Sequence, residues 1–223
     1  MRDTILFDIN ETVLDLSALR PKFEVVFGDP SVTPLWFAML LHTSTVCAIT
    51  GVRSRFADLA GTALTTLAAR RGVVVSDQHR SDILGTFAAL RPHADVAPAL
   101  RQLRDAGFRT VAFSNSSLAL VTSQITNSGL ASLFDEILSV EESGSFKPDP
   151  MVYRALSDRL DRPLKELRLV ATHDWDTHGA LSAGLLAAYI DRTGAPYTAQ
   201  YMRPDIFETN MGAIAEVIIA AAG

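Results

Sequence analysis

The second half of the chain alternates short apolar runs with segments in which apolar residues recur at helical spacing. The apolar runs predict strands at 109–113, 136–139, 167–172 and 186–191, after a first strand at 4–7. The periodic segments predict helices at 96–106, 118–127, 150–160, 176–184 and 211–222. The last of these could also pass for a core strand, but its length and alanine content favour a helix. Such alternation is typical of a parallel sheet with helices on both faces.

Residues 15–95 follow a different pattern, with helical periodicity and no convincing strand. We expect helices at 17–27, 34–49, 56–70 and within 76–90. Ser17 and Thr33 are the expected N-caps, while Gly28 and Gly51 end the first two helices. The pattern therefore predicts an α/β core formed by 1–14 and 96–223, with a helical domain at 15–95 inserted after the first strand.

Composition and charge narrow the class of protein. The 223 residues suffice for a core domain and a smaller one, and 48% hydrophobic with 20% charged residues is ordinary for a soluble enzyme. The net charge of -5 argues against a nucleic-acid partner. We see no signal peptide, and no uninterrupted apolar stretch reaches the roughly 18 residues of a membrane span. We therefore expect a cytoplasmic protein without a membrane partner. The single cysteine, Cys47, excludes an intrachain disulfide and a cysteine-based metal site.

Polar residues collect where three of the predicted strands end. They are Asp8, Asn10 and Thr12 after the first strand, Ser114 and Asn115 after 109–113, and His173, Asp174, Trp175 and Asp176 after 167–172. Lys147 precedes the helix at 150–160. Ligands of parallel sheets bind outside the carboxyl ends of the strands, so these groups should share one crevice. A carboxylate there can act as a nucleophile, a lysine can keep it ionised, and a second carboxylate can activate water. Taken alone, Asp8 could equally cap a turn or a helix.

Four segments carry these residues: 7–15 (FDINETVLD), 113–115 (FSN), 147–153 (KPDPMVY) and 175–180, which begins Trp-Asp and ends Gly-Ala. In this order they resemble the four motifs of the haloacid dehalogenase superfamily, and most of all the type II, L-2-haloacid dehalogenases. The insertion at 15–95 matches the family's cap domain in place and size. The resemblance implies a Rossmann-like core with a helical cap, hydrolysis of the carbon–halogen bond of small 2-haloalkanoic acids, no metal, and a homodimer in which the apolar cap helix is a plausible interface.

The resemblance also implies roles for the charged residues. Asp8 would displace halide from C2 and form an ester, and Lys147 would pair with Asp8. Asp176 would activate the water that attacks the ester. Thr12 and Ser114 would hydrogen-bond the Asp8 or substrate carboxylate. Asn115 and Trp175 would line the halide and substrate pocket, and Tyr153 would support the region of Asp8. Apart from the resemblance, we expect substrate contacts from Asn10, His173 and two aromatic residues of the cap, Trp36 and Phe37, although such aromatic residues more often serve plain packing.

Three positions depart from the family pattern. The family usually carries an arginine beside a tryptophan of the cap helix, where this chain has Phe37 after Trp36. Arg53 and Arg55 could substitute only through a different geometry. In the fourth motif, Ala171 and His173 stand where the family often carries Ser and Asn. Asp174 adds an acid that competes with Asp176 for the water-activating role.

Two alternatives remain open from sequence. One is a Mg²⁺-dependent phosphatase of the same superfamily, with the metal held by Asp8, Asp174 and Asp176. Such phosphatases carry a second aspartate two residues after the nucleophile as general acid, and Asn10 cannot donate a proton in the same way. The other is a non-catalytic protein with the same fold, suggested by the missing arginine. The combination of Asp8, Lys147 and Asp176 argues against it.

Overall fold

The computed structural model describes residues 4–222, and its centre is a six-stranded sheet in the order β5-β4-β1-β6-β7-β8. All five pairings are parallel. The strands are β1 (Thr4–Phe7), β4 (Arg109–Ser114), β5 (Glu136–Ser139), β6 (Leu167–Ala171), β7 (Leu186–Ile190) and β8 (Ile206–Glu208). β1 lies between β4 and β6, with Phe7 paired to Ala112 and to Val170. The residues that follow these three strands therefore meet at one edge, and the predicted α/β class is confirmed.

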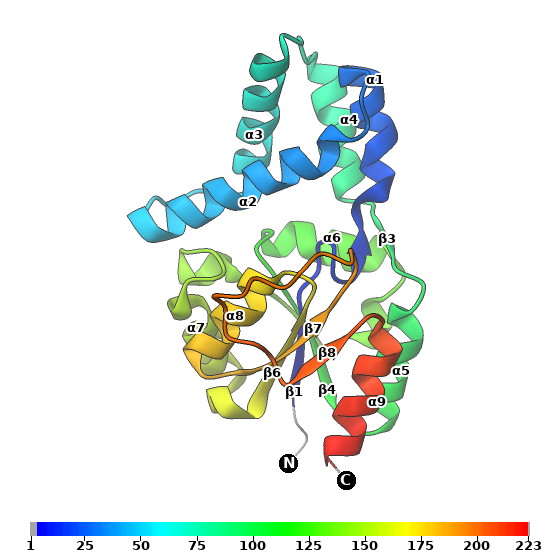
Figure 1. Ribbon diagram of the computed structural model, residues 1–223, viewed down its shortest axis with the longest axis vertical. Coiled ribbons are helices and arrows are strands. Elements are labelled where there is room, and N and C mark those ends of the chain that lie inside the picture. The colour runs from blue at the N-terminus through cyan, green and yellow to red at the C-terminus, as the bar shows by residue number, and fades with distance from the viewer. Residues whose placement is uncertain (1–3, 223) are drawn as a thin grey trace.

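Helices cover both faces of this sheet (Figure 1). α5 (Val96–Asp105) and α9 (Met211–Ala222) pack together on one side, and α7 (Pro150–Leu160) and α8 (Asp174–Ala183) on the other. α6 (Leu118–Asn127) packs near β5. The predicted bounds of α6, β5, α7 and α9 agree with the structure. α8 begins two residues earlier than predicted, and β8 was not predicted.

Four helices form a cap above the carboxyl ends of the strands (Figure 1). They are α1 (Arg20–Phe27), α2 (Val32–Thr50), α3 (Phe56–Arg71) and α4 (Asp77–Phe87), preceded by a 3-10 turn, η1 (Leu16–Leu19). Two predicted N-caps were wrong. Asp15, not Ser17, caps η1, because Ser17 N donates to Asp15 Oδ1 at 2.8 Å. α2 begins before Thr33, so Ser31 occupies its N-cap position.

α2 is the long helix of the cap, with 19 residues and a mean hydropathy of 1.5 over its most apolar window. By length and composition it could cross a membrane, which the search for uninterrupted apolar runs did not anticipate. A core helix of a soluble protein passes the same test. One face packs on α3, where the Trp36 indole N–H donates to Ala60 O at 3.1 Å. The other face exposes Leu35, Val46 and Ile49.

The chain enters and leaves the cap at one place. There β2 (Leu14–Asp15) and β3 (Arg91–Pro92) pair antiparallel, and His93 N donates to Val13 O at 3.0 Å. This pair corrects the expectation that residues 15–95 contain no strand. Two residues are too few to show the alternation that predicts a strand. The pairing places the two crossings side by side.

Candidate active site

Three neighbouring strands deliver the polar residues of the site, as predicted. Asp8 directly follows β1, and its backbone N–H donates to Val170 O of β6 at 3.0 Å. Ser114 is the last residue of β4, and His173 follows β6. Since β1 pairs with both of those strands, the register alone brings these side chains to a common edge.

The ammonium of Lys147 joins the two acids of the site. Its Nζ lies 2.8 Å from Asp8 Oδ1 and 2.7 Å from Asp176 Oδ2, and it donates to Phe113 O at 3.3 Å. The side chain has no exposed surface. Its backbone N–H donates to Asn115 Oδ1 at 2.9 Å, which fixes the loop that presents it. Burial lowers the pKa of Lys147, but the charges of Asp176 and Asp8 outweigh it, so the lysine stays protonated.

The carboxylate of Asp8 is held ionised on both oxygens. Thr12 Oγ1 donates to Asp8 Oδ2 at 2.7 Å, and that hydroxyl accepts from Thr172 N at 2.9 Å. His173 Nδ1 lies 3.3 Å from the same Oδ2, at ion-pair distance but without hydrogen-bond geometry. Burial raises the pKa of Asp8, but Lys147 and His173 together hold it well below its ordinary value. The group is therefore available as an anionic nucleophile.

The pKa of Asp176 is shifted upward, in the opposite direction to that of Asp8. Asp176 lies in the first turn of α8 with no exposed surface, and Tyr153 Oη donates to its Oδ1 at 2.6 Å. Burial raises the pKa of Asp176, and with the nearby charge of Asp8 it outweighs the lowering effect of Lys147. Burial also raises the pKa of Tyr153, which stays a neutral donor. Two carboxyl groups with pKa values pushed in opposite directions suit a nucleophile and a proton acceptor.

The structure separates the two acids that competed from sequence. Asp174 Oδ2 accepts from Thr198 N at 3.2 Å and from Thr198 Oγ1 at 2.6 Å, whereas Asp176 contacts Lys147. Among residues 4–222 no group of three or more His, Cys, Asp or Glu side chains could hold a metal ion. The donor set that a Mg²⁺ phosphatase would need therefore does not fit, because Asp8 and Asp176 converge on an ammonium and Asp174 is directed elsewhere.

Two other predicted site residues, Asn10 and Ser114, form hydrogen bonds with Ser116 in the loop after β4. Asn10 Nδ2 donates to Ser116 Oγ at 3.3 Å, and Asn10 Oδ1 accepts from Gln124 Nε2 of α6 at 3.0 Å. Ser114 Oγ accepts from Ser116 N at 3.1 Å. Within the described chain, neither Asn10 nor Ser114 hydrogen-bonds Asp8. Asn10 thus connects the first loop to α6 and to Ser116 through its amide oxygen and its amide nitrogen.

Aromatic rings enclose His173. Its ring stacks on Trp175 with centroids 5.0 Å apart, and Phe37 of the cap lies 6.2 Å from it. Phe37 therefore reaches the site, as predicted. Trp36 has no exposed surface and packs against Phe37 from inside the cap, so it forms a second layer and not the wall of the crevice.

The two arginines considered as substitutes for the family's cap arginine lie on another side. Arg55 pairs with Asp58 through two hydrogen bonds of 2.9 and 3.1 Å. Arg53 lines a separate pocket of about 410 Å³ that Asn115 also lines. Within the described chain neither pairs with Asp8, and α2 brings Phe37, not a guanidinium, to the ring of His173. Arg20 of α1, also in the cap, lines a pocket together with Glu11 and His173.

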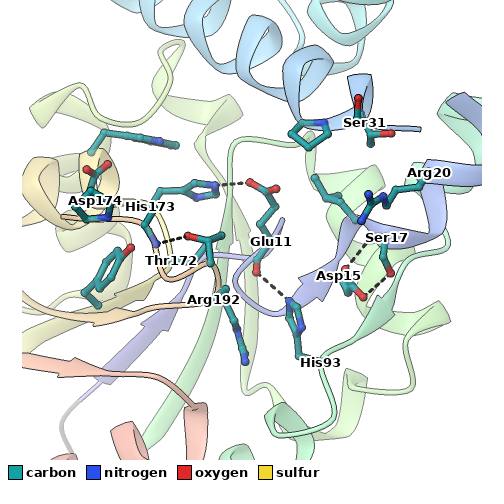
Figure 2. Close-up of a pocket in the computed structure, with 18 residues that line it drawn as sticks. Glu11, Asp15, Ser17, Arg20, Ser31, His93, Thr172, His173, Asp174 and Arg192 are labelled. Atoms are coloured by element: carbon teal, nitrogen blue, oxygen red, sulfur yellow. Dashed lines mark hydrogen bonds and ion pairs between the residues drawn. The ribbon is translucent and has the colours of Figure 1, made fainter. Parts of the chain in front are cut away.

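Sequence reasoning missed Glu11. Its Oε2 lies 2.9 Å from His173 Nε2, and its backbone O lies 3.0 Å from His93 Nε2 (Figure 2). Its φ of 65° is in the left-handed region, which is uncommon for a residue with a side chain. Glu11 and His173 both line a pocket of about 630 Å³ between core and cap. The only sequence signal was an acid three residues after Asp8.

The contacts of His173 make it a cation. Burial lowers its pKa, but hydrogen bonding and the charges of Asp8 and Glu11 raise it to about 10. The core thus supplies a positive charge on His173, and the ring of Phe37 in the cap lies next to this charge.

Comparison with known proteins agrees with this geometry. Residues 2–168 match the family of haloacid dehalogenase-like hydrolases. The chain belongs to this family. It is 26% identical over 217 residues to an (S)-2-haloacid dehalogenase of Pseudomonas fluorescens, covering 96% of this chain and 95% of that one. It resembles the L-2-haloacid dehalogenase RSc1362 with a TM-score of 0.93 and 23% identity, covering 97% and 98% of the two chains. It also resembles the L-2-haloacid dehalogenase of Xanthobacter autotrophicus with chloropropionic acid covalently bound. For this pair the TM-score is 0.90 and the identity 21%, covering 98% of this chain and 98% of that one. The helical cap over a parallel α/β core is thus the fold of this family.

Proposed function

We propose that the chain hydrolyses the carbon–halogen bond of small 2-haloalkanoic acids through an ester on Asp8. The observation that carries the proposal is the Asp8–Lys147–Asp176 array, an ionised carboxylate and a second acid on one buried ammonium. The similarity to (S)-2-haloacid dehalogenases over nearly the whole chain supports it. So does the structural similarity to the L-2-haloacid dehalogenase of Xanthobacter autotrophicus with chloropropionic acid covalently bound.

In the first step, an oxygen of Asp8 forms a bond to C2 as the carbon–halogen bond breaks, and the halide leaves with the bonding electrons. A halide needs no proton, so Asn10 in place of an acid is no obstacle. Lys147 keeps Asp8 ionised before the attack. Without a guanidinium on the cap helix, the leaving halide would be received by the Asn115 amide and by the edges of Phe37 and Trp175.

In the second step, water attacks Cγ of the Asp8 ester. Asp176 accepts the proton from this water, because its raised pKa suits a general base better than the strongly ionised Asp8. Tyr153 orients Asp176 through the 2.6 Å hydrogen bond. The products are the 2-hydroxy acid and free Asp8.

Release of chloride from 2-chloropropanoate in the presence of EDTA tests the proposal. We expect release to continue in EDTA and to be abolished in Asp8→Asn, while Asp105→Asn, an exposed acid on α5, serves as the matched control. A fully active Asp8→Asn enzyme would contradict the mechanism. If EDTA stops turnover and phosphate esters are cleaved with Mg²⁺, the chain is a phosphatase.

We also propose a homodimer formed through α2. Leu35, Val46 and Ile49 are 44%, 43% and 80% exposed on this helix. Apolar side chains gathered on one exposed face are typical of a protein–protein contact.

A further inference from the structure

The imidazole of His173 is held between two carboxylates. Nε2 is hydrogen-bonded to Glu11 at 2.9 Å, while Nδ1 faces Asp8 Oδ2 at 3.3 Å and has no hydrogen-bond partner within the described chain, although it is buried. Phe37 and Trp175 pack against the ring and restrict its rotation. A buried N–H without a partner is costly, so the position of Nδ1 beside Oδ2 calls for a role in some state of the site.

We propose that His173 stabilises the oxyanion that forms on Asp8 when the ester is hydrolysed, with Glu11 as the positioning residue that holds the ring. The inference rests on the proposed function and concerns its second step. It assigns to the core a cation that acts on Asp8 itself, and it makes the absence of an arginine beside Trp36 less relevant to this half of the reaction.

The two oxygens of Asp8 have different surroundings, and this difference assigns one as the attacking atom and the other as the carbonyl oxygen of the ester. Oδ2 faces the Thr12 hydroxyl and His173, whereas Oδ1 faces Lys147. Attack through Oδ1 leaves Oδ2 as the carbonyl oxygen of the ester, with the Thr12 hydroxyl hydrogen-bonded to it and His173 Nδ1 3.3 Å away. Donors that are in place before negative charge develops stabilise a transition state without reorganisation.

Hydrolysis then proceeds as follows. The water oxygen bonds to Cγ, its proton passes to Asp176, and the electron pair of the carbonyl moves onto Oδ2 beside His173 Nδ1–H. The pair returns as the Cγ–Oδ1 bond breaks. Oδ1 leaves with C2 of the product and takes a proton from Lys147 Nζ, which regains one from Asp176. The carboxylic acid re-formed on Asp8 releases its proton to solvent.

Glu11 keeps this arrangement intact while Asp8 is esterified. The ester removes the negative charge of Asp8, and burial then disfavours the charged ring. The titratable groups in contact with the ring are Asp8 and Glu11, and Lys147 lies on the far oxygen of Asp8. Among residues 4–222, Glu11 is then the remaining carboxylate paired with the ring. A left-handed backbone at a residue with a side chain is kept where the surrounding structure requires it, and here it directs the carboxylate to Nε2.

Rapid-quench kinetics with 2-chloropropanoate separate the two steps, because chloride reports ester formation and the mass of the intact protein reports the ester. In His173→Phe we expect a stoichiometric chloride burst, accumulation of the ester, and hydrolysis slowed by about 10²-fold, the usual effect of removing one oxyanion donor. His173→Asn restores a neutral donor and should recover part of the rate. Glu11→Gln should slow hydrolysis less than His173→Phe.

Asp105→Asn is the matched control, since Asp105 is exposed on α5 and lies outside the pocket that Glu11 and His173 line. It should leave both steps unchanged. Loss of the chloride burst in His173→Phe, or hydrolysis at the wild-type rate, would overturn the inference and leave the proposed function standing. Absence of chloride release from the wild-type enzyme would instead refute the proposed function and this inference with it.

Discussion

At the scale of single residues, the site is a balanced set of buried charges. Lys147 and His173 are cations, and Asp8, Asp176 and Glu11 provide the carboxyl groups that contact them. Buried charges are tolerated only when each is paired and hydrogen-bonded. Esterification of Asp8 removes one negative charge. The two cations then favour the development of negative charge on the carboxyl group of Asp8 during hydrolysis.

The raised pKa of His173 makes stability depend on pH. Its pKa is about 10 in the folded chain against an ordinary value of 6.5. A group whose pKa is raised by folding contributes stability that is fully present below its unfolded pKa and is lost as the pH rises through the folded value. The free energy of unfolding, measured with urea, should therefore fall between pH 6.5 and about 10.

His173→Asn should flatten this decline, while the same substitution at the exposed His42 of α2 should leave it unchanged. A decline of equal steepness in His173→Asn would show that other groups cause it.

The sequence could identify only some of these residues. Asp8, Lys147 and Asp176 follow from strand ends and from the resemblance, because their positions depend on the order of motifs. Glu11 could not be found in this way. Its role depends on a left-handed backbone turn and on a ring 162 positions further along the chain. Neither is encoded in a local pattern.

At the scale of elements, the contact between α8 and the loop before α7 sets the position of Tyr153. A Cβ at Gly179 of α8 would lie 2.6 Å from Pro148 Cβ and 2.8 Å from Tyr153 Oη. The absence of a side chain at Gly179 thus lets Tyr153 reach Asp176.

Gly179→Ala should destabilise the protein by roughly 1–3 kcal/mol through overpacking, and should lower the rate of ester hydrolysis by displacing the Tyr153 hydroxyl. Gly85→Ala in α4 is the matched control, because nothing lies within 4 Å of its Cβ. It should leave activity unchanged and add about 0.5–1 kcal/mol of stability. Thermal unfolding and rapid-quench kinetics measure both effects. An unchanged Gly179→Ala enzyme would contradict this packing argument.

Elements were predicted best where a local signal fixes their ends. The bounds of α7 agree with the prediction, because Pro150 begins the helix and Asp149 caps it, its Oδ1 accepting from Met151 N at 2.8 Å. At the start of the cap, Ser17 was expected as the N-cap, but the chain first forms the turn η1, which Asp15 caps. β8 was missed because three residues that pair along one edge of the sheet carry no periodic signal.

At the scale of the whole molecule, the insertion of a helical cap after the first strand was predicted because the strand–helix alternation stops and resumes. The position of the cap relative to the core was not predicted, since it depends on contacts between segments that are far apart in the sequence. Phe37 against His173 and the pairing of β2 with β3 are such contacts.

The proposed dimer belongs to this scale. Light scattering should give twice the chain mass of 24.1 kDa, and Ile49→Asp should give 24.1 kDa because a charge would replace an apolar contact. Val74→Asp, in an exposed segment outside α2, should remain dimeric. A wild-type protein of 24.1 kDa would refute the proposal.

The pairing of β2 with β3, where the chain passes between core and cap, connects the position of the cap with the ion pair of Glu11 and His173. The two paired strands form one line along which the cap is joined to the core. That line adjoins the turn of Glu11, whose N–H donates to Leu14 O at 2.8 Å and whose carbonyl contacts His93. A swing that moves Phe37 away to admit substrate would also draw Glu11 from His173. Opening the site and weakening the counter-charge of His173 would then be one and the same motion.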